Sequence, residues 1–294
     1  MRNKVLGIAG LLAAMITTHA AAAEFTAKDL AAEEGKFAAY SVKNGMRAAF
    51  IEFFADDSLL LRPDPVDGRT YMRAQAEPAI VLDWKSQITV LSASGDLGMS
   101  TGPSKVMSKT DPKLPPSFGQ FFSVWQKQKN GDWRVLLDHG ISPGNSIAPD
   151  IPLAAYDLAP AAASPSAVAA YGGEARFVAR TTEAGADKAY AESVTNQTRL
   201  IRAGRVPIDG TVAIGQYLKS IEGKWTWEAL KQGASKANDF AYALGTYSWQ
   251  PAEGPEQKGH YIRVWSRDLK ADPNRWILAG EILTPRPPAP VKKS

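Results

Sequence analysis

Pro65-Val66-Asp67-Gly68 recurs in this chain as Pro207-Ile208-Asp209-Gly210, and the landmarks around the two tetrapeptides follow one order. Each tetrapeptide is preceded by a phenylalanine and followed by a tryptophan, an aspartate, a glycine and two further tryptophans, and these landmarks mark out two copies of one longer segment. These are Phe37, Trp84, Asp96, Gly102, Trp125 and Trp133 in the first copy, and Phe177, Trp227, Asp239, Gly245, Trp265 and Trp276 in the second. A repeat with so long a period indicates a duplicated domain and not a solenoid of short repeats.

Each copy changes along its length from a helical pattern of apolar residues to a strand pattern. The first copy predicts helices at 28–44 and 46–54, a short strand at 58–62, a helix at 69–77 and strand runs at 80–92, 97–107, 118–129 and 133–141. The second copy follows the same order from residue 176. An antiparallel sheet with one apolar face needs a cover, so helices segregated to that face predict an α+β fold of two tandem domains.

The composition between and around the copies predicts the domain boundaries. We expect a signal peptide at 1–23, a first domain at 24–142, a linker rich in proline and alanine at 143–173, a second domain at 174–285 and a flexible tail at 286–294.

The first residues have the pattern of an export signal. Met1-Arg2-Asn3-Lys4 is basic, Val5 to Ile16 is apolar, and Ala21-Ala22-Ala23 precedes Glu24. The apolar run is shorter than the ~20 residues of a membrane-spanning helix. The pattern therefore predicts a periplasmic or secreted protein that begins at Glu24, with an uncleaved membrane anchor as the alternative.

The composition excludes several classes of site. The chain has no cysteine, so it has no disulfide, thiolate metal site or cysteine nucleophile. Its net charge of +4 falls to about +2 without Arg2 and Lys4, and no basic stripe is interleaved with aromatic residues, so nucleic acid is not an expected partner. Two histidines remain once the predicted signal peptide is removed, and neither has a carboxylate at the spacing of a metal site, so no metal is expected. The sequence also has no glycine-rich phosphate loop, and no cofactor is expected.

Three segments together resemble the NTF2-like superfamily, specifically its SnoaL-like or DUF4440-like exported members. They are the helical opening Phe37-Ala38-Ala39-Tyr40 with Ala49 to Asp57, the turn Pro65 to Arg69, and the closing hairpin Val124 to Ser142. The resemblance covers nearly all of the first copy and, more loosely, the second. It implies a cone-shaped fold in which a curved sheet wraps helices around a cavity. It implies no single activity, because the superfamily includes ketosteroid isomerases, cyclases, dehydratases and binding modules.

Asp138-His139, near the end of the last strand of the first copy, is the catalytic candidate. Strand alternation places Trp133, Val135, Leu137 and His139 on the more apolar face, so His139 is expected to face the cavity and Asp138 to face outward, unless a bulge reverses them. A cavity histidine with a near-neutral pKa can act as a general acid or base. The alternative is a hydrogen-bonded histidine that caps the core.

The second copy has Glu281-Ile282 in place of this pair. We expect Glu281 at the surface or a sheet edge, since charged residues are rarely buried unpaired; a buried acid with a raised pKa is the alternative. Tyr261 and Arg263 share a strand face with Trp265 and are candidates for binding an anionic or aromatic ligand, unless Arg263 forms a salt bridge within the sheet.

Aromatic residues of the first copy are the candidates for lining a ligand cavity, because such cavities are mostly apolar. The predicted residues are Tyr40, Phe50, Phe54, Tyr71, Trp84 and Phe121. Gly98-Met99-Ser100-Thr101-Gly102 matches the nucleophile pattern G-x-S-x-G, but that elbow needs a strand-to-helix turn, and here the surroundings predict a sheet.

Three functions are compatible with these sequence features. The first is an exported module that binds a small apolar molecule or has a structural role, with the two domains packed as an intramolecular pseudo-dimer or the chain forming a homodimer. The second is an isomerase, cyclase or dehydratase that uses His139. The third is a protein-interaction module. The loss of the histidine in the second copy favours the first.

Overall fold

The computed structural model describes residues 24–142, 152–159, 171–267, 272 and 274–287. The predicted signal peptide at 1–23 lies outside the described residues, as do most of the predicted linker and tail. Below, the first half means the described residues up to 159, and the second half means those from 171.

The first half opens with two helices, α1 (Ala27–Asn44) and α2 (Met46–Phe53). Thr26 and Asp29 form a capping box at the start of α1, and Gly45, with a φ of 101°, permits the sharp turn between the helices. The remaining elements are β1 (Phe54–Leu61), β2 (Pro65–Asp67), α3 (Gly68–Ala74), β3 (Ile80–Trp84), β4 (Ile88–Leu91), β5 (Leu97–Ser108), β6 (Ser117–Lys127) and β7 (Trp133–Ile141).

The sheet of the first half has the order β2-β1-β7-β6-β5-β4-β8, and β3 pairs with β5 beside β4. Most pairs are antiparallel, whereas β1 lies parallel to β7 and β4 lies parallel to β8. Strand β8 (Ala154–Asp157) falls within the predicted linker, so part of that segment is a strand. Asp157 also accepts a hydrogen bond from the backbone of Ala27 at 2.6 Å, which ties β8 to the start of α1.

The second half repeats this order, except that one long strand stands in place of β3 and β4 and none of its described strands corresponds to β8. It contains α4 (Gly172–Ala184), α5 (Ala186–Ser193), β9 (Arg199–Arg202), β10 (Ile208–Asp209), α6 (Gly210–Lys219), β11 (Gly223–Ala234), β12 (Phe240–Pro251), β13 (Gln257–Ser266) and β14 (Ile277–Pro285). Its sheet has the order β10-β9-β14-β13-β12-β11, with β9 parallel to β14. The α+β prediction is confirmed, with helices packed against two curved, mostly antiparallel sheets. None of the helices in the described part of the chain has the length and apolarity to cross a membrane.

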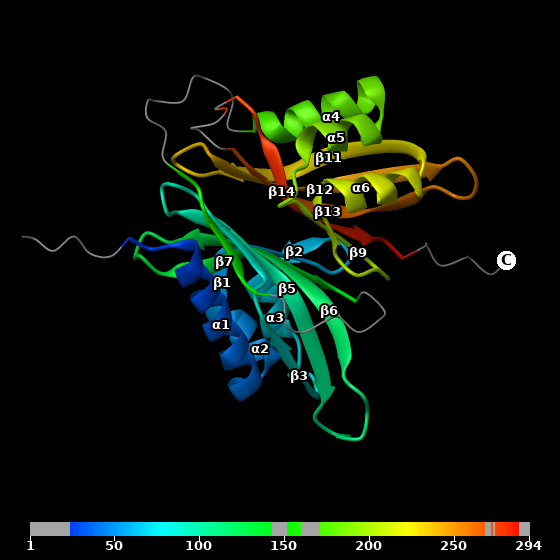
Figure 1. The fold of residues 1–294 in the computed structure, drawn as a ribbon. Coiled ribbons are helices and arrows are strands. Elements are labelled where there is room, and N and C mark those ends of the chain that lie inside the picture. Colours follow the sequence, from blue (N-terminus) through cyan, green and yellow to red (C-terminus); the bar gives the residue numbers. More distant parts are fainter. Residues whose placement is uncertain (1–23, 143–151, 160–170, 268–271, 273, 288–294) are drawn as a thin grey trace, which may run out of the picture.

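The two sheets face each other, and the helices lie on the outer faces (Figure 1). One apolar cluster lies between helices and sheet in each half, around Phe37 in the first and Phe177 in the second. A third cluster lies between the sheets and contains residues of both halves, including Met99, Phe122, Leu137, Leu244, Ile262 and Ile282. The central strands of each sheet, such as β6, β7 and β14, are thus covered on both faces, whereas β11 at a sheet edge alternates exposed and buried residues.

Candidate functional site

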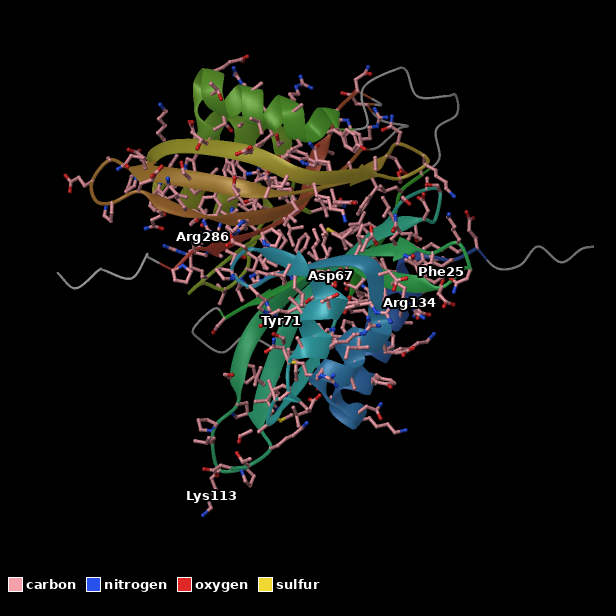
Figure 2. The ribbon with its side chains drawn as sticks, turned by 180° about the vertical axis from the view of Figure 1, so that it is seen from behind. Phe25, Asp67, Tyr71, Lys113, Arg134 and Arg286 are labelled. Carbon is pink, nitrogen blue, oxygen red and sulfur yellow. The ribbon has the colours of Figure 1, made fainter. Side chains whose placement is uncertain are left out.

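A cavity of about 280 Å³ opens within the first half. Its buried end is formed by Phe50, Trp84, Phe121 and Asp138, and its mouth by the exposed residues Ser117, Gly140 and Ser142. The walls between them are lined by Met46, Arg62, Ile80, Leu82, Ser104, Val106, Phe118, Gly119 and Ile141. The walls are therefore largely apolar, with Arg62 and Asp138 as the charged side chains of the lining. The hairpin that carries Ser104 and Ser117 projects away from the second half, with Lys113 at its tip (Figure 2).

The structure reverses the predicted orientation of Asp138 and His139. The pairing of β6 with β7 shifts by one residue, because Val124 pairs with Leu137 while Trp125 pairs with Val135. Leu136 is therefore an extra residue, a β-bulge, and both it and Leu137 face the second half. Beyond the bulge every side chain changes face, so Asp138 lines the cavity and His139 does not. The expectation that His139 faces the cavity is wrong, because it assumed that side chains alternate along β7 without interruption, and the bulge interrupts this alternation.

Asp138 is a buried carboxylate with few partners. The Ser123 hydroxyl on β6 donates a hydrogen bond to it at 2.9 Å. Burial raises the pKa of Asp138 to about 6, although the Ser123 hydrogen bond and the Arg62 charge act in the opposite direction. A carboxyl with this pKa is present in both protonation states near neutral pH, so it can donate or accept a hydrogen bond in the cavity.

His139 is buried on the other face of β7, which contacts the second half. It is 4% exposed, and neither ring nitrogen has a hydrogen-bond partner among the described residues. Burial, together with the nearby Arg62 and His260, lowers the pKa of His139 to about 3. The imidazole is therefore neutral at ordinary pH and lies outside the cavity lining.

Glu34 on α1 is a buried carboxylate that was not among the predicted site residues; it lies outside the cavity lining but is hydrogen-bonded to Trp84, which lines the cavity. It is 1% exposed and accepts hydrogen bonds from the indole nitrogens of Trp84 and Trp125, each at 2.7 Å. Burial raises the pKa of Glu34 to about 7, and the charge of Asp138 contributes in the same direction. A signal was present, because Glu34 falls on the apolar stripe of its helix between Leu30 and Phe37.

Three of the six predicted aromatic residues of the first half meet at the cavity, namely Phe50, Trp84 and Phe121. The other three do not line it. Phe54 begins β1 and is fully buried in the core, so the expectation that it continues the second helix is wrong. Tyr40 packs on Phe53 at 5.8 Å between ring centroids, and Tyr71 packs against the same core from α3 (Figure 2).

The second half holds the counterpart of Asp138, Glu281, among its own polar side chains. Glu281 is fully buried and accepts hydrogen bonds from Arg202, Arg263 and Tyr190. Burial alone raises its pKa, but the charges of Arg263 and Arg202 outweigh burial and hold the pKa below its ordinary value. Both the expected surface position of Glu281 and the alternative of a raised pKa are wrong, since neither anticipates two arginines in the core.

The residues predicted to bind an anion in the second half converge on a carboxylate of the chain itself. Tyr261, Arg263 and Trp265 all donate to Glu174 on α4, at 2.7, 2.9 and 2.8 Å. The alternative reading of Arg263 as a salt-bridged residue is confirmed.

Ser100 has no nucleophilic setting. It is fully buried within β5, and its hydroxyl lies 2.8 Å from that of Ser86. The surroundings are sheet, as expected, and not a strand-to-helix elbow. Within the described residues, no group of three or more aspartate, glutamate or histidine side chains is arranged to hold a metal ion.

No protein-family model matches the chain, and no curated protein matches it. Several solved structures resemble part of it. An NTF-2 like protein of unknown function from Shewanella oneidensis is 17% identical, with a TM-score of 0.32, and the match covers 38% of this chain and 95% of that one. A conserved protein from Planctomyces limnophilus is 14% identical, with a TM-score of 0.31 over 39% of this chain and 92% of that one.

A third similar structure is the Δ5-3-ketosteroid isomerase of a Mycobacterium species, which is 7% identical. Its TM-score is 0.33, and the match covers 40% of this chain and 93% of that one. At TM-scores of about 0.3, these similarities assign no activity to this chain.

Proposed function

We propose that the first half binds a small, largely apolar molecule in its cavity, with Asp138 as the polar contact at the buried end. The observation that carries this proposal is the cavity itself, about 280 Å³ with mostly apolar walls and one convergent carboxyl group. Ligand cavities in proteins are commonly apolar with a few placed polar groups, and this volume lies just below their usual ~300–1,000 Å³. The ligand is accordingly small.

A thermal-shift screen of small apolar compounds tests this proposal with a matched pair of variants. Val106 lines the cavity, whereas its neighbour Met107 on β5 does not. Val106→Trp should fill the cavity and abolish the shift of any true ligand, and Met107→Trp should leave the shift unchanged. A ligand that shifts both variants equally binds elsewhere, and this result would reject the cavity as its site.

A second candidate function is acid–base catalysis by Asp138, of the isomerase, cyclase or dehydratase type. The position of Asp138 in the cavity with a pKa of about 6 supports this candidate, because general catalysis is most effective when the pKa lies near the working pH. Any compound found in the screen should then be turned over with a rate that depends on a group of pKa near 6. Asp138→Asn should lower the rate by roughly a hundredfold or more while the compound still binds. If a compound binds but is not turned over, the catalytic candidate is rejected and only the binding function is supported.

We further propose that the facing sheets form an intramolecular pseudo-dimer, so that the chain is a monomer in solution. The shared apolar cluster between the halves supports this, as does the buried side chain of Arg199, which donates to Gln87 of the other half at 2.9 Å. Arg286, at the start of the predicted tail, forms an ion pair with Asp64 of the first half (Figure 2). Light scattering after gel filtration tests this proposal, and a concentration-dependent dimer mass would contradict it.

We also propose export to the periplasm or the medium. The basic, apolar and alanine-rich order of the first 23 residues supports this proposal. The intact mass of the protein from a bacterial host tests it, because cleavage should leave Glu24 as the first residue. A full-length mass in the membrane fraction would favour the uncleaved anchor.

A further inference from the structure

The duplication places equivalent carboxylates at the centre of each half. Trp125 donates its indole hydrogen to Glu34 at 2.7 Å, and Trp265 donates to Glu174 at 2.8 Å. The second carboxylates also correspond, because Asp138 pairs with Leu60 of β1 and Glu281 pairs with Leu200 of β9.

One strand position between these carboxylates carries a short side chain in the first half and a long cationic one in the second. In β6 the residue opposite Asp138 is Ser123, and in β13 the residue opposite Glu281 is Arg263. Arg263 is fully buried and bridges the two carboxylates of its half, since it donates to Glu174 at 2.9 Å and to Glu281. Ser123 has only a hydroxyl, which reaches Asp138 alone.

Aromatic rings enclose the guanidinium group of Arg263. Its central carbon lies 3.8 Å from the ring centroid of Trp227, 4.2 Å from that of Phe177 and 4.4 Å from that of Tyr261. Such ring faces attract cations. The corresponding residues of the first half, by order along the repeat, are Trp84, Phe37 and Phe121, of which Trp84 and Phe121 line the cavity.

The charges of the two centres do not match. In the second half, Arg202 and Arg263 balance Glu174 and Glu281. In the first half, Arg62 is the one cationic side chain in the lining of the cavity. Both carboxylates are kept, with Asp138 in the lining and Glu34 outside it, hydrogen-bonded to Trp84 and Trp125. Arg62 does not exclude a second cation, because its counterpart Arg202 shares Glu281 with Arg263.

We propose that the cavity of the first half accepts a small organic cation of the guanidinium, amidinium or alkylammonium class. Its charged group takes the position that the Arg263 guanidinium holds in the second half, against the carboxylate of Asp138 and the rings of Trp84 and Phe121. The Glu34 carboxylate, which accepts the indole hydrogen of Trp84, adds a second negative charge from outside the lining. The apolar remainder of the ligand extends along Leu82 and Val106 toward the mouth. This inference rests on the proposed binding function and specifies the chemistry of its ligand.

Benzamidine and benzamide test the proposal, because the two molecules have nearly the same shape and only benzamidine is positively charged at neutral pH. Binding of each to the full chain is measured by titration calorimetry at pH 7.5 and pH 5.5. Benzamidine should bind at least tenfold more tightly than benzamide at pH 7.5. Its advantage should shrink at pH 5.5, where protons compete for the carboxylates.

Two variants separate charge recognition from simple filling of the cavity. Asp138→Asn keeps the shape of the side chain and should remove the preference for benzamidine, with circular dichroism as the check on folding. Ser123→Arg supplies the missing guanidinium from the chain itself and should abolish the binding of both probes. Arg134→Gln alters an arginine that the cavity lining does not include, and it should change neither affinity.

The outcomes distinguish this inference from the proposed function. If benzamide binds as tightly as benzamidine, the cation assignment is overturned, but the cavity remains a ligand site. If benzamidine keeps its advantage in Asp138→Asn, the cation lies elsewhere and the assignment is again overturned. If neither probe binds, the assignment fails, and the screen of apolar compounds with Val106→Trp decides separately on the cavity.

Discussion

Asp96 and Asp239 each accept a backbone hydrogen bond from a loop of the other half, and the two bonds are equivalent. Asp239 accepts the backbone N–H of Ala93 at 2.8 Å, and Asp96 accepts that of Lys236 at 3.2 Å. Each aspartate also accepts the hydroxyl of a serine four residues before it in its own loop. The two hydrogen bonds are reciprocal, like the paired contacts across the two-fold axis of a symmetric dimer, but here both partners belong to one chain.

Replacement of Asp239 by alanine should weaken the contact between the halves. Asp239 is fully buried, so the variant leaves the N–H of Ala93 and the hydroxyl of Ser235 without this acceptor. We expect a loss of about 1–3 kcal/mol in the free energy of unfolding, measured with urea. Asp96→Ala should cost less because Asp96 is only partly buried. Equal and negligible effects in both variants would contradict a stabilising exchange.

Glu34→Gln should change how stability depends on pH. The folded pKa of Glu34 is raised to about 7 by burial, whereas the unfolded value is near 4.5. The folded protein therefore holds this proton more tightly, and the free energy of unfolding decreases as pH rises between these values, by about 3 kcal/mol at most. The variant lacks this contribution, so the stability difference between wild type and variant should shrink or reverse as pH rises.

Glu33→Gln is the control for that measurement, since Glu33 lies beside Glu34 on α1 and forms a surface ion pair with Lys36. Its stability difference from wild type should be nearly constant between pH 4.5 and 7. If Glu34→Gln behaves in the same way, Glu34 does not hold its proton as described.

His139→Leu should make the protein more resistant to acid. Burial lowers the pKa of His139 to about 3 from an unfolded value of 6.5, so the unfolded chain binds this proton first as pH falls. Stability is therefore lost between pH 6.5 and 3 in the wild type, and the variant escapes a loss of about 3 kcal/mol at pH 4. Acid-unfolding curves measure the effect. An unchanged midpoint would show that His139 is not buried in the neutral form.

Arg263→Ser should unfold at much lower denaturant concentration, because it removes the ion pair of the buried Glu174 and leaves Glu281 with Arg202 alone. Loss of one partner of a buried ion pair commonly costs about 3–5 kcal/mol. Methylguanidinium should restore part of this stability by occupying the vacated position, whereas guanidine-free salts at equal ionic strength should not. Wild-type protein given the same low concentration of methylguanidinium provides the reference, and equal stabilisation of both proteins would contradict specific rescue.

The order of elements could be predicted from the sequence because it depends on local signals. The helix ending at Asn44-Gly45, the turn at Asp67-Gly68 and the strand runs all follow from periodicity and turn residues. The paired landmarks also predicted the duplication. These signals do not depend on which parts of the chain meet in space.

The candidate site depended on features that local patterns do not contain. The bulge at Leu136 reverses the faces on which the following side chains of β7 lie, and the pattern of apolar and polar residues from Trp133 to His139 does not predict it. The burial of Glu281 depends on Arg202 and Arg263, which lie on two other strands. Glu34 was the exception, since a carboxylate on an apolar helical stripe is a local signal of a buried, partnered charge.

The strand at Ala154–Asp157 alters where this protein can be divided. It extends the sheet of the first half beside β4, and through Asp157 it also holds the first residue of α1. A fragment that ends at Ser142 would therefore leave β4 as a bare sheet edge, exposed to pairing with other chains. A fragment meant to keep the sheet of the first half intact therefore has to extend through β8.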